Sequence, residues 1–399
     1  MKILFISACE DFSDTSAAIR NRAIVKGLVK VSHVTSVEFL LSEKRESKKK
    51  VTAYNKICIK YRKNKSDNYR SHSNSNIIIK SMFLKKLKRV FRLFFPDILS
   101  IYCLFKGVGE LYEFTEKNEF DYIILNSDPK GIHFLLFNFR FKRFLDSNPG
   151  SKVVTVWGDP WYLDIHTRKS WLVKVIERAV LRRSDFIAYN TLGTLKAQKA
   201  FYADFRERMI FLPRTIDLKS SQDESQARSE ESINILYAGD YRSVSRNILP
   251  LYESFSSLHD LSLTICGNSD FQIFSHKNIK VLGRQSKQYV DELIGEAGLL
   301  VVLLNLHGTQ LPGKLYDYAI TNKPILMLYE DISQTYQVPF PTRFIFLKNE
   351  TSVIFDFFEN FKNKQFSVDV SLNKEMEGYM TSAVVKKFFL DMGEEGFRG

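Results

Sequence analysis

The chain has 399 residues, of which 44% are hydrophobic and 26% are charged, and its formal net charge is +13 at pH 7. These proportions are those of a globular protein and exclude a disordered or collagen-like chain. At about 100–200 residues per domain, the length predicts two domains, or three. The four cysteines show no paired spacing, and no apolar run approaches the length of a transmembrane helix, so we expect reduced thiols and no membrane span.

In the first half of the chain, short apolar segments alternate with helical patterns. This alternation predicts a parallel sheet with helices on both faces. We expect strands over 3–7, 34–40, 121–126, 152–157, 185–189 and 209–212, and helices over 17–30 and 171–182.

Most of the positive charge lies in residues 44–92, which contain 17 Lys or Arg and two acids and therefore carry +15. The remaining residues sum to −2, so the chain is nearly neutral outside this segment. Within it, a helix predicted over 83–95 has apolar residues on one face and cations on another, and Pro96 ends it. This pattern is typical of a helix that lies on an anionic membrane surface. Its membrane-binding cations would be Lys85, Lys88, Arg89 and Arg92.

Two alternatives exist for this basic helix. An amphipathic helix that packs on its own domain, with a solvated basic face, fits the same periodicity equally well. Nucleic acid is a third possible partner, but no recognisable nucleic-acid module occurs in the chain, so we expect none. With the membrane as partner, the protein would be cytoplasmic and peripheral on the inner face of the membrane.

A polar segment over 219–232 predicts a linker, and the alternation of strands and helices restarts after it. The expected fold class is therefore α/β, with two Rossmann-like doubly wound domains facing a central cleft. In the second half we expect strands over 233–238, 261–266, 279–282, 299–304, 324–328 and 344–347, and helices over 247–257, 287–296, 314–320 and 376–390.

Two arginines follow the first strand of the second half. Gly239 comes directly after this strand and lets a ligand approach the backbone closely. Arg242 and Arg246 would stand where the next helix begins, an arrangement suited to a pyrophosphate. Two exposed arginines on a loop are the alternative. Further along, Gly283 and Arg284 form a predicted turn that can hold a nucleobase edge.

The most informative segment follows the apolar strand over 299–304. Pro312 and Gly313 open a predicted helix, and Lys314 near its start can meet a phosphate. Asp317, about one turn later, can accept hydrogen bonds from a ribose diol. A capped helix with a solvated Lys and Asp is the alternative. We favour the site, because polar residues after a buried strand of a doubly wound sheet face the ligand cleft.

Residues 311–318, LPGKLYDY, and 323–326, KPIL, resemble the P-x-K-L-x-E-Y … G-K-P-I/V block of GT-B glycosyltransferases, and of glycosyltransferase family 4 in particular. The resemblance places Asp317 where the family has the glutamate that holds the nucleotide ribose, and Thr309 where it often has another glutamate. It implies that the second half binds a nucleotide diphosphate sugar as donor. The donor-binding residues would be Gly239, Arg242, Arg246, Gly283, Arg284, Thr309, Pro312, Gly313, Lys314, Leu315 and Asp317.

The first half resembles the acceptor domain of the same family. Residues 184–191, SDFIAYNT, are similar to its A-D-x-I-x-x-x-S strand, and 212–217, LPRTID, to its I-P-N-G-V-D crossover. In VWGDPW, residues 156–161, Asp159 would face the cleft and orient an acceptor hydroxyl or act as general base; a turn-forming Asp-Pro is the alternative. His133, on the helix after the third predicted strand, would contact the donor sugar, although a lone histidine is more often structural.

The resemblance implies a glycosyltransferase of hexosyltransferase type that moves a sugar from a nucleotide diphosphate sugar to a hydroxyl of a lipid-linked or surface-polysaccharide acceptor, with retention of configuration. We expect no metal, since no clear Asp-x-Asp pair occurs, and no cofactor besides the donor substrate. The alternatives are a GT-B nucleotide-sugar epimerase and a non-catalytic nucleotide-sugar-binding assembly protein.

The same resemblance suggests the domain boundaries. The acceptor-binding domain would span 1–215, with the basic insertion over about 43–100, and the donor domain would span 233–372. A helix within 373–399 would pack back on the first domain.

Overall fold

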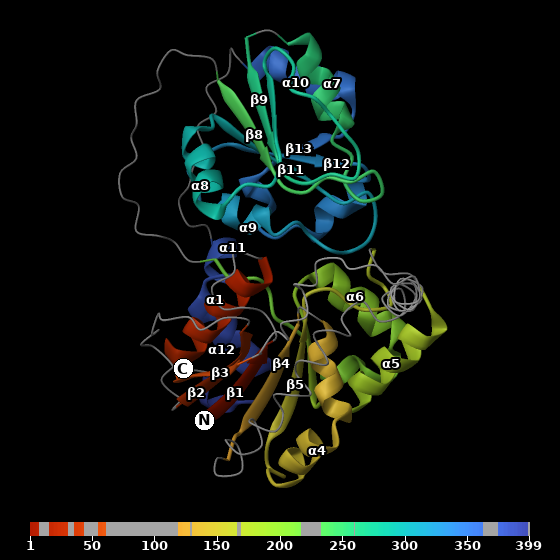
Figure 1. Ribbon diagram of the computed structural model, residues 1–399, viewed down its shortest axis with the longest axis vertical. Helices are drawn as coiled ribbons and strands as arrows, with labels where there is room; N and C mark the ends of the chain where they lie inside the picture. Colours follow the sequence, from red (N-terminus) through yellow and green to blue (C-terminus); the bar gives the residue numbers. More distant parts are fainter. Residues whose placement is uncertain are drawn as a thin grey trace, which may run out of the picture. The chain divides into compact units, whose positions relative to one another are not determined.

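The chain of the computed structural model forms two compact units (Figure 1). The first contains Met1–Asn190, Thr194–Leu212 and Val385–Gly399, and the second contains Thr191–Gly193 and Pro213–Val384. The helix predicted over 83–95 and the linker predicted over 219–232 lie outside the described residues. The structure describes residues 1–7, 16–30, 36–43, 55–60, 119–127, 130–165, 169–216, 233–258, 260–361 and 374–397.

The first unit is built on a seven-stranded parallel sheet with the order β3-β2-β1-β4-β5-β6-β7. All five residues of β4 are buried, as expected of a strand whose two faces are both covered by other elements. The strand order reverses between β1 and β4, which makes their carboxyl ends the switch point of this sheet. The strands are β1 (Lys2–Ser7), β2 (Ser36–Glu43), β3 (Asn55–Lys60), β4 (Tyr122–Asn126), β5 (Lys152–Trp157), β6 (Phe186–Tyr189) and β7 (Met209–Phe211).

Two helices of the first unit, α4 and α5, begin where polar side chains cap them. Asn138 accepts hydrogen bonds from two backbone N–H groups at the start of α4, and Ser170 accepts one at the start of α5. The buried face of α5 is apolar apart from one carboxylate, Glu177. The helices are α1 (Ser16–Lys30), α4 (Phe139–Asp146), α5 (Trp171–Arg182) and α6 (Leu192–Phe201), with 3-10 helices η1 (Lys130–Phe137), η2 (Ala203–Arg208) and η5 (Glu395–Phe397).

The end of the chain completes the core of the first unit. The helix α12 (Thr381–Asp391) begins in the second unit and ends in the first. Its Phe389 ring packs edge-to-face on Tyr122 of β4, with 5.5 Å between the ring centroids, and the Tyr122 hydroxyl donates a hydrogen bond to Glu394. Residues distant in sequence therefore share one core.

The second unit contains a six-stranded parallel sheet with the order β10-β9-β8-β11-β12-β13. Its strands are β8 (Asn234–Ala238), β9 (Ser262–Cys266), β10 (Ile279–Leu282), β11 (Leu299–Leu303), β12 (Ile325–Tyr329) and β13 (Ile345–Lys348). Its helices are α7 (Leu249–Ser257), α8 (Lys287–Glu296), α9 (Lys314–Ala319), α10 (Thr351–Phe361) and α11 (Lys374–Glu377), with 3-10 helices η3 (Ile332–Gln337) and η4 (Pro341–Arg343).

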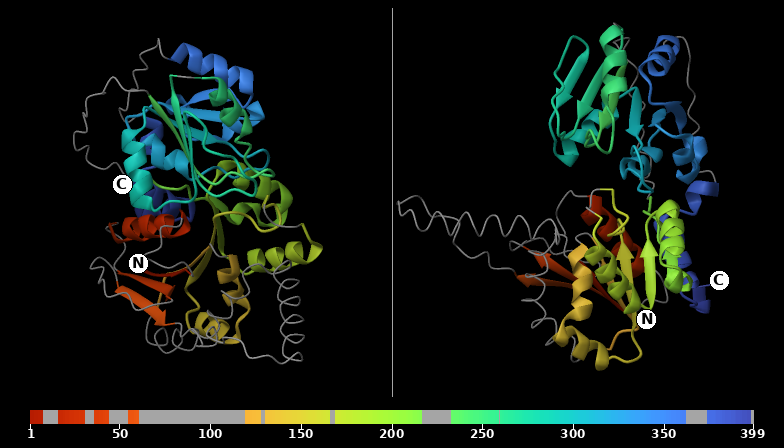
Figure 2. Two further views of the ribbon diagram at one scale, coloured as in Figure 1. Left: turned by 45° about the horizontal axis from the view of Figure 1, so that its top comes forward. Right: turned by 90° about the vertical axis from the view of Figure 1, so that its right-hand side faces the viewer.

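Helices cover both faces of this second sheet (Figure 2). Successive residues of β8 point to opposite faces: Ile235 and Tyr237 join a core with α7 and α10, and Leu236 and Ala238 join a core with α8 and α9. The strand order reverses between β8 and β11, so the switch point of this sheet lies at their carboxyl ends.

The predicted fold class is confirmed, because both units are parallel α/β sheets of the Rossmann-like type. Every predicted strand is present within a few residues. The sequence analysis did not predict β3, α4, α6 or α10. Within the described residues, no helix is long and apolar enough to cross a membrane.

Candidate functional site

Two loops meet at the switch point of the second unit, one after β8 and one after β11. They are joined by a hydrogen bond of 2.8 Å from the Leu306 N–H to the Ser245 carbonyl. A second bond, of 2.9 Å, runs from Arg246 Nε to Asn305 Oδ1. Ligands of doubly wound sheets bind at such strand ends. This edge of the second unit is therefore the candidate donor site.

Both predicted phosphate-binding arginines lie on the loop after β8. Arg246 is half-buried, and its Nη1 also donates to the Asp240 carbonyl at 3.2 Å, so part of its guanidinium braces the two loops. Arg242 is exposed and pairs with Arg246 through the backbone. The pKa of Asp270 is lowered first by hydrogen bonds from Ser243 and further by Arg242, so that carboxylate lies near the arginine.

Glycines allow the ends of β8, β9 and β10 to approach one another. The Gly239 N–H donates to the Cys266 carbonyl at 2.9 Å, and a Cβ at Gly267 would overlap the Gly239 carbonyl. The Cys266 thiol lies 3.6 Å from the carbonyl oxygen of Gly283. Gly283 is exposed and has open space around it, and the next residue, Arg284, is also exposed. The predicted Gly239 and Gly283 are thus brought to one cluster.

Lys314 is the first residue of α9 and lies close to this cluster. Burial is the main cause that lowers the pKa of Lys314. Burial also raises the pKa of the Cys266 thiol, and the charge of Lys314 acts against that rise. Its ammonium lies 5.9 Å from the centroid of the Tyr318 ring. Within the described residues this ammonium makes no hydrogen bond or ion pair. A partly desolvated cation without such a partner is suited to an anionic ligand.

Asp317 shares a face of α9 with Lys314, since the two are three residues apart. The opposite face is fixed by Leu315, which is fully buried. Asp317 Oδ1 accepts a hydrogen bond of 2.7 Å from Nη2 of Arg214, a residue that the sequence analysis did not select. Of the other predicted donor residues, Pro312 is buried, and Thr309 and Gly313 are half-buried in the loop before α9.

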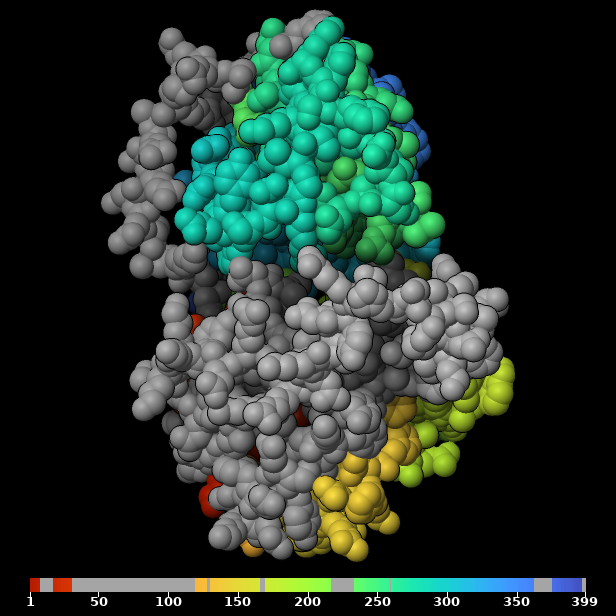
Figure 3. All heavy atoms as spheres, in the orientation of Figure 1, coloured from red at the N-terminus to blue at the C-terminus, as the bar shows by residue number. Residues whose placement is uncertain are grey.

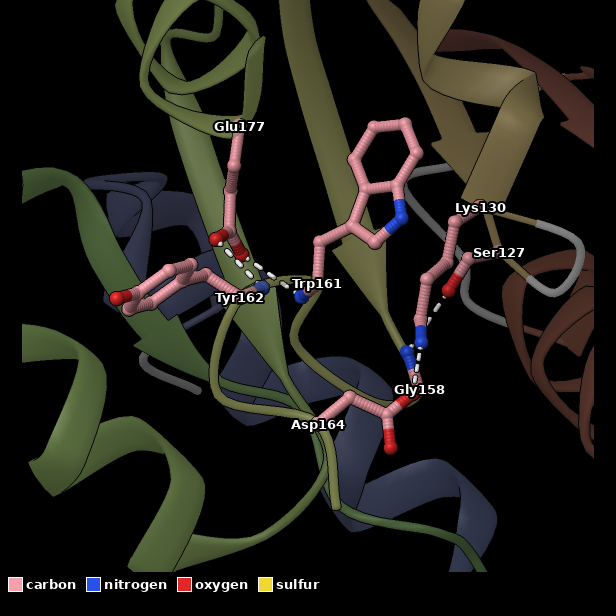
Figure 4. Close-up of polar contacts among 7 residues, drawn as sticks. All are labelled: Ser127, Lys130, Gly158, Trp161, Tyr162, Asp164 and Glu177. Atoms are coloured by element: carbon pink, nitrogen blue, oxygen red, sulfur yellow. Dashed lines mark hydrogen bonds and ion pairs between the residues drawn. The ribbon is translucent and has the colours of Figure 1, made fainter. Parts of the chain in front are cut away.

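In the first unit, the predicted Asp159 lies on a loop that follows β5, and this loop is held at several points (Figure 4). The Gly158 N–H donates to Ser127 Oγ at 2.9 Å. Further along, Asp164 forms a buried ion pair with Lys130. Asp159 itself is half-buried. The loop therefore presents Asp159 from a fixed backbone at the carboxyl edge of the sheet.

Glu177 of α5 supplies the third anchor of this loop. Its two carboxylate oxygens accept hydrogen bonds of 2.9 Å from the backbone N–H groups of Trp161 and Tyr162, and the Tyr202 hydroxyl donates a further bond of 2.9 Å. Burial raises the pKa of Glu177, while these hydrogen bonds and the charge of Lys130 act against that rise.

The predicted His133 lies in η1 and is fully buried. Its ring stacks on Trp157 of β5 with 4.0 Å between the centroids. Burial, with a smaller effect of Lys130, lowers its pKa to about 3, so the ring is neutral at pH 7. In the described part of the chain, neither ring nitrogen has a hydrogen-bond partner.

Sequence reasoning missed Arg214, Asn305, Lys130 and Glu177. One of them carries a signal: Glu177 interrupts the apolar face of the 171–182 pattern, and a charge at such a position needs buried partners. Arg214 lies in the crossover, where nothing in the sequence points to α9. Within the described residues, no group of three or more His, Cys, Asp or Glu is arranged to hold a metal ion.

No model of a protein family matches the chain, and no curated protein matches it. Solved structures match over almost its whole length. An α,α-trehalose-phosphate synthase (UDP-forming) from Burkholderia xenovorans has a TM-score of 0.61 at 9% identity and covers 100% of both chains. HepE from Anabaena, in complex with UDP and glucose, has a TM-score of 0.60 at 11% identity, over 98% of this chain and 99% of its own.

A putative UDP-N-acetylglucosamine 2-epimerase from Listeria monocytogenes is also similar, with a TM-score of 0.52 at 11% identity, over 99% of this chain and 96% of its own. At such identities the likeness establishes the fold, which is that of the GT-B glycosyltransferases. Assignment to glycosyltransferase family 4 stays a prediction.

Proposed function

We propose that the protein is a glycosyltransferase that moves a sugar from a nucleotide diphosphate sugar to a hydroxyl of a lipid-linked or surface-polysaccharide acceptor. The observation that carries the proposal is Lys314, a partly desolvated ammonium that makes no hydrogen bond or ion pair within the described residues, beside the switch point of the second unit. The similarity in fold to HepE, whose structure holds UDP and glucose, supports a nucleotide sugar as ligand.

Charge stabilisation is the chemistry that this site would provide. Breaking the anomeric C–O bond leaves negative charge on the nucleotide diphosphate. Lys314 and the outer N–H groups of Arg246 would neutralise that charge from fixed positions, and Arg242 would add to it. Because these cations replace a divalent ion, the proposed reaction is independent of metal, and it uses no cofactor besides the donor.

Hydrogen bonding would orient the two substrates. The Asp317 carboxylate would accept hydrogen bonds from the ribose hydroxyls of the donor. In the first unit, Asp159 would orient the acceptor hydroxyl or take its proton. The neutral His133 ring would contact the donor sugar. Retention of configuration is proposed from the resemblance to family 4.

We also propose that the protein binds an anionic membrane surface from the cytoplasmic side. The basic helix predicted over 83–95 is the main support. The described residues add apolar side chains that are exposed beside cations. Trp171 and Val175 of α5 are 76% and 53% exposed, and Lys174 lies between them. Phe139 of α4, a helix whose surface appears in yellow in Figure 3, is 65% exposed and stacks on Arg140.

Replacing Lys314 by Ala tests the donor site. We expect affinity for the donor to fall by about 10- to 100-fold, because a charge-assisted contact with the diphosphate is lost. Transfer of a radiolabelled sugar from a panel of nucleotide sugars to a lipid extract would fall with it. The matched control is Lys348→Ala, which removes an exposed lysine paired with Glu350 in the same unit. Unchanged transfer by both Lys314→Ala and Asp317→Ala would show that the donor site is misplaced.

The same assay separates two other candidates. An epimerase, which the similar Listeria monocytogenes protein favours, would convert the donor without any acceptor. A non-catalytic assembly protein would bind the nucleotide sugar and convert nothing. Release of a nucleoside diphosphate that requires the lipid extract would support the transferase over both.

A further inference from the structure

We propose that Arg214 is a positioning residue that holds the Asp317 carboxylate for a ribose diol, and so makes the site selective for ribonucleotide donors. This inference rests on the proposed function and deepens it. It starts from the ion pair of 2.7 Å between Arg214 Nη2 and Asp317 Oδ1.

The Arg214 side chain is fixed in place on more than one side. It is only 10% exposed, and its guanidinium lies 6.0 Å from the centroid of the Tyr316 ring. Its backbone belongs to a segment that is itself tied down, since the Ile216 N–H donates to the Tyr379 carbonyl at 2.9 Å. A planar guanidinium that is held over an aromatic face is a stable anchor for a carboxylate.

The ion pair leaves half of the Asp317 carboxylate for a ligand. A carboxylate accepts hydrogen bonds at both oxygens, and Arg214 contacts Oδ1. Within the described residues Oδ2 accepts no hydrogen bond, and the Asp317 side chain is 39% exposed. An exposed Asp normally samples several rotamers, which a ligand must then order at a cost in affinity. Arg214 removes that cost in advance, so the diol meets an acceptor that is already oriented.

The alternative is that the pair only fastens the crossover segment to α9. Partly exposed ion pairs contribute little to folding stability. The segment is also held by the Ile216 contact, which does not involve Asp317. A purely structural role predicts a uniform loss of affinity for every nucleotide, whereas a positioning role predicts loss only for nucleotides that carry the diol.

The test compares each ribonucleoside diphosphate with its 2′,3′-dideoxy form by calorimetry, starting with UDP and continuing with GDP, ADP and CDP. For the tightest binder, the wild-type protein should prefer the ribose form by roughly tenfold or more, the effect of one hydrogen bond to a charged group. In Arg214→Met, which keeps an unbranched apolar side chain and removes the guanidinium, this preference should shrink toward one while the affinity for the dideoxy form stays. Arg214→Lys should give an intermediate ratio.

Two controls keep the outcomes distinct. Arg182→Met removes an exposed arginine of the first unit and should leave the ratio unchanged. Asp317→Asn should lower the ratio at least as far as Arg214→Met. A ratio that Arg214→Met leaves at the wild-type value, with nucleotide still bound, overturns the role of Arg214 alone. Failure of the wild-type protein to bind any of the four diphosphates overturns the proposed function and this inference together.

Discussion

Glu177 is fully buried, and among the described residues its hydrogen bonds come from Tyr202 and from the N–H groups of Trp161 and Tyr162, in the loop after β5 that carries Asp159. A buried carboxylate is costly unless donors surround it, and two of the three donors here are backbone N–H groups. The same contacts that compensate the charge therefore fix the path of the chain after β5. This residue links the stability of the first unit to the geometry of the candidate acceptor side.

We expect Glu177→Gln to lower the free energy of unfolding by about 2–4 kcal/mol. The amide keeps one acceptor oxygen but turns an N–H donor toward the other backbone N–H, which then has no partner. Urea unfolding followed by circular dichroism measures the loss. Asp204→Asn is the control, because Asp204 pairs with Arg178 at the surface and its removal should cost less than about 1 kcal/mol. Equal losses in the two variants would contradict this account of Glu177.

The environment of single residues is harder to predict from the sequence than the presence of a strand. Lys314 and Asp317 stand out in the sequence because they follow a buried strand, and the structure places both on α9. Their binding of the donor stays a prediction. Arg214 is separated from Asp317 by 103 positions. Its role depends on how the crossover folds against α9, and no local pattern encodes that. For His133 the sequence predicts a contact with the donor sugar, with a structural role as the alternative. Its full burial against Trp157 depends on the packing of η1 on β5, which no local pattern encodes.

At the scale of elements, the strands were predictable and the helices less so. The buried strands of a parallel sheet are nearly continuous apolar runs, as in β4 and β11, and such runs stand out in a sequence. The strand β3 has alternating residues within a highly charged segment and lacks this signal. The helix α9 has only six residues, which is too few to show a helical period of apolar residues. Pro312 and Gly313, which precede it, predict its start instead.

The ends of β8 and β9 lie close together at Gly267. At Gly267 a side chain would overlap the carbonyl of Gly239, which is backbone and cannot rotate away. Gly267→Ala should therefore push the two strand ends apart, lower the free energy of unfolding by roughly 1–3 kcal/mol and weaken donor binding at the switch point. Urea unfolding and calorimetry with the donor nucleotide measure the two effects.

Another glycine of the same unit supplies the comparison. Gly295 lies in α8 with no atom near an added Cβ, and Ala is the better helix former, so Gly295→Ala should stabilise the protein by about 0.5–1 kcal/mol. If Gly267→Ala raised the free energy of unfolding as Gly295→Ala does, the close approach of the strand ends would not limit the residue at position 267.

Charge is distributed unevenly over the whole molecule, and this asymmetry bears on where the protein works. Residues 44–92 carry +15, whereas the rest of the chain sums to −2. Attraction to an anionic surface would then depend on one segment of the chain. A surface that combines cations with exposed apolar side chains, as α4 and α5 do, can contact both the headgroups and the upper acyl region of a leaflet.

Replacing Lys85, Lys88, Arg89 and Arg92 together by Glu should therefore release the protein from vesicles of anionic lipid, since each cation near the surface contributes about 1 kcal/mol. Co-sedimentation with such vesicles measures binding, and binding by the wild-type protein should weaken as salt is raised. A control with the same net charge replaces four exposed lysines outside α4 and α5, namely Lys196, Lys277, Lys280 and Lys348, by Glu. If both variants detach equally, net charge rather than the predicted helix governs binding. If the first variant stays bound, the membrane contact does not depend on these four cations.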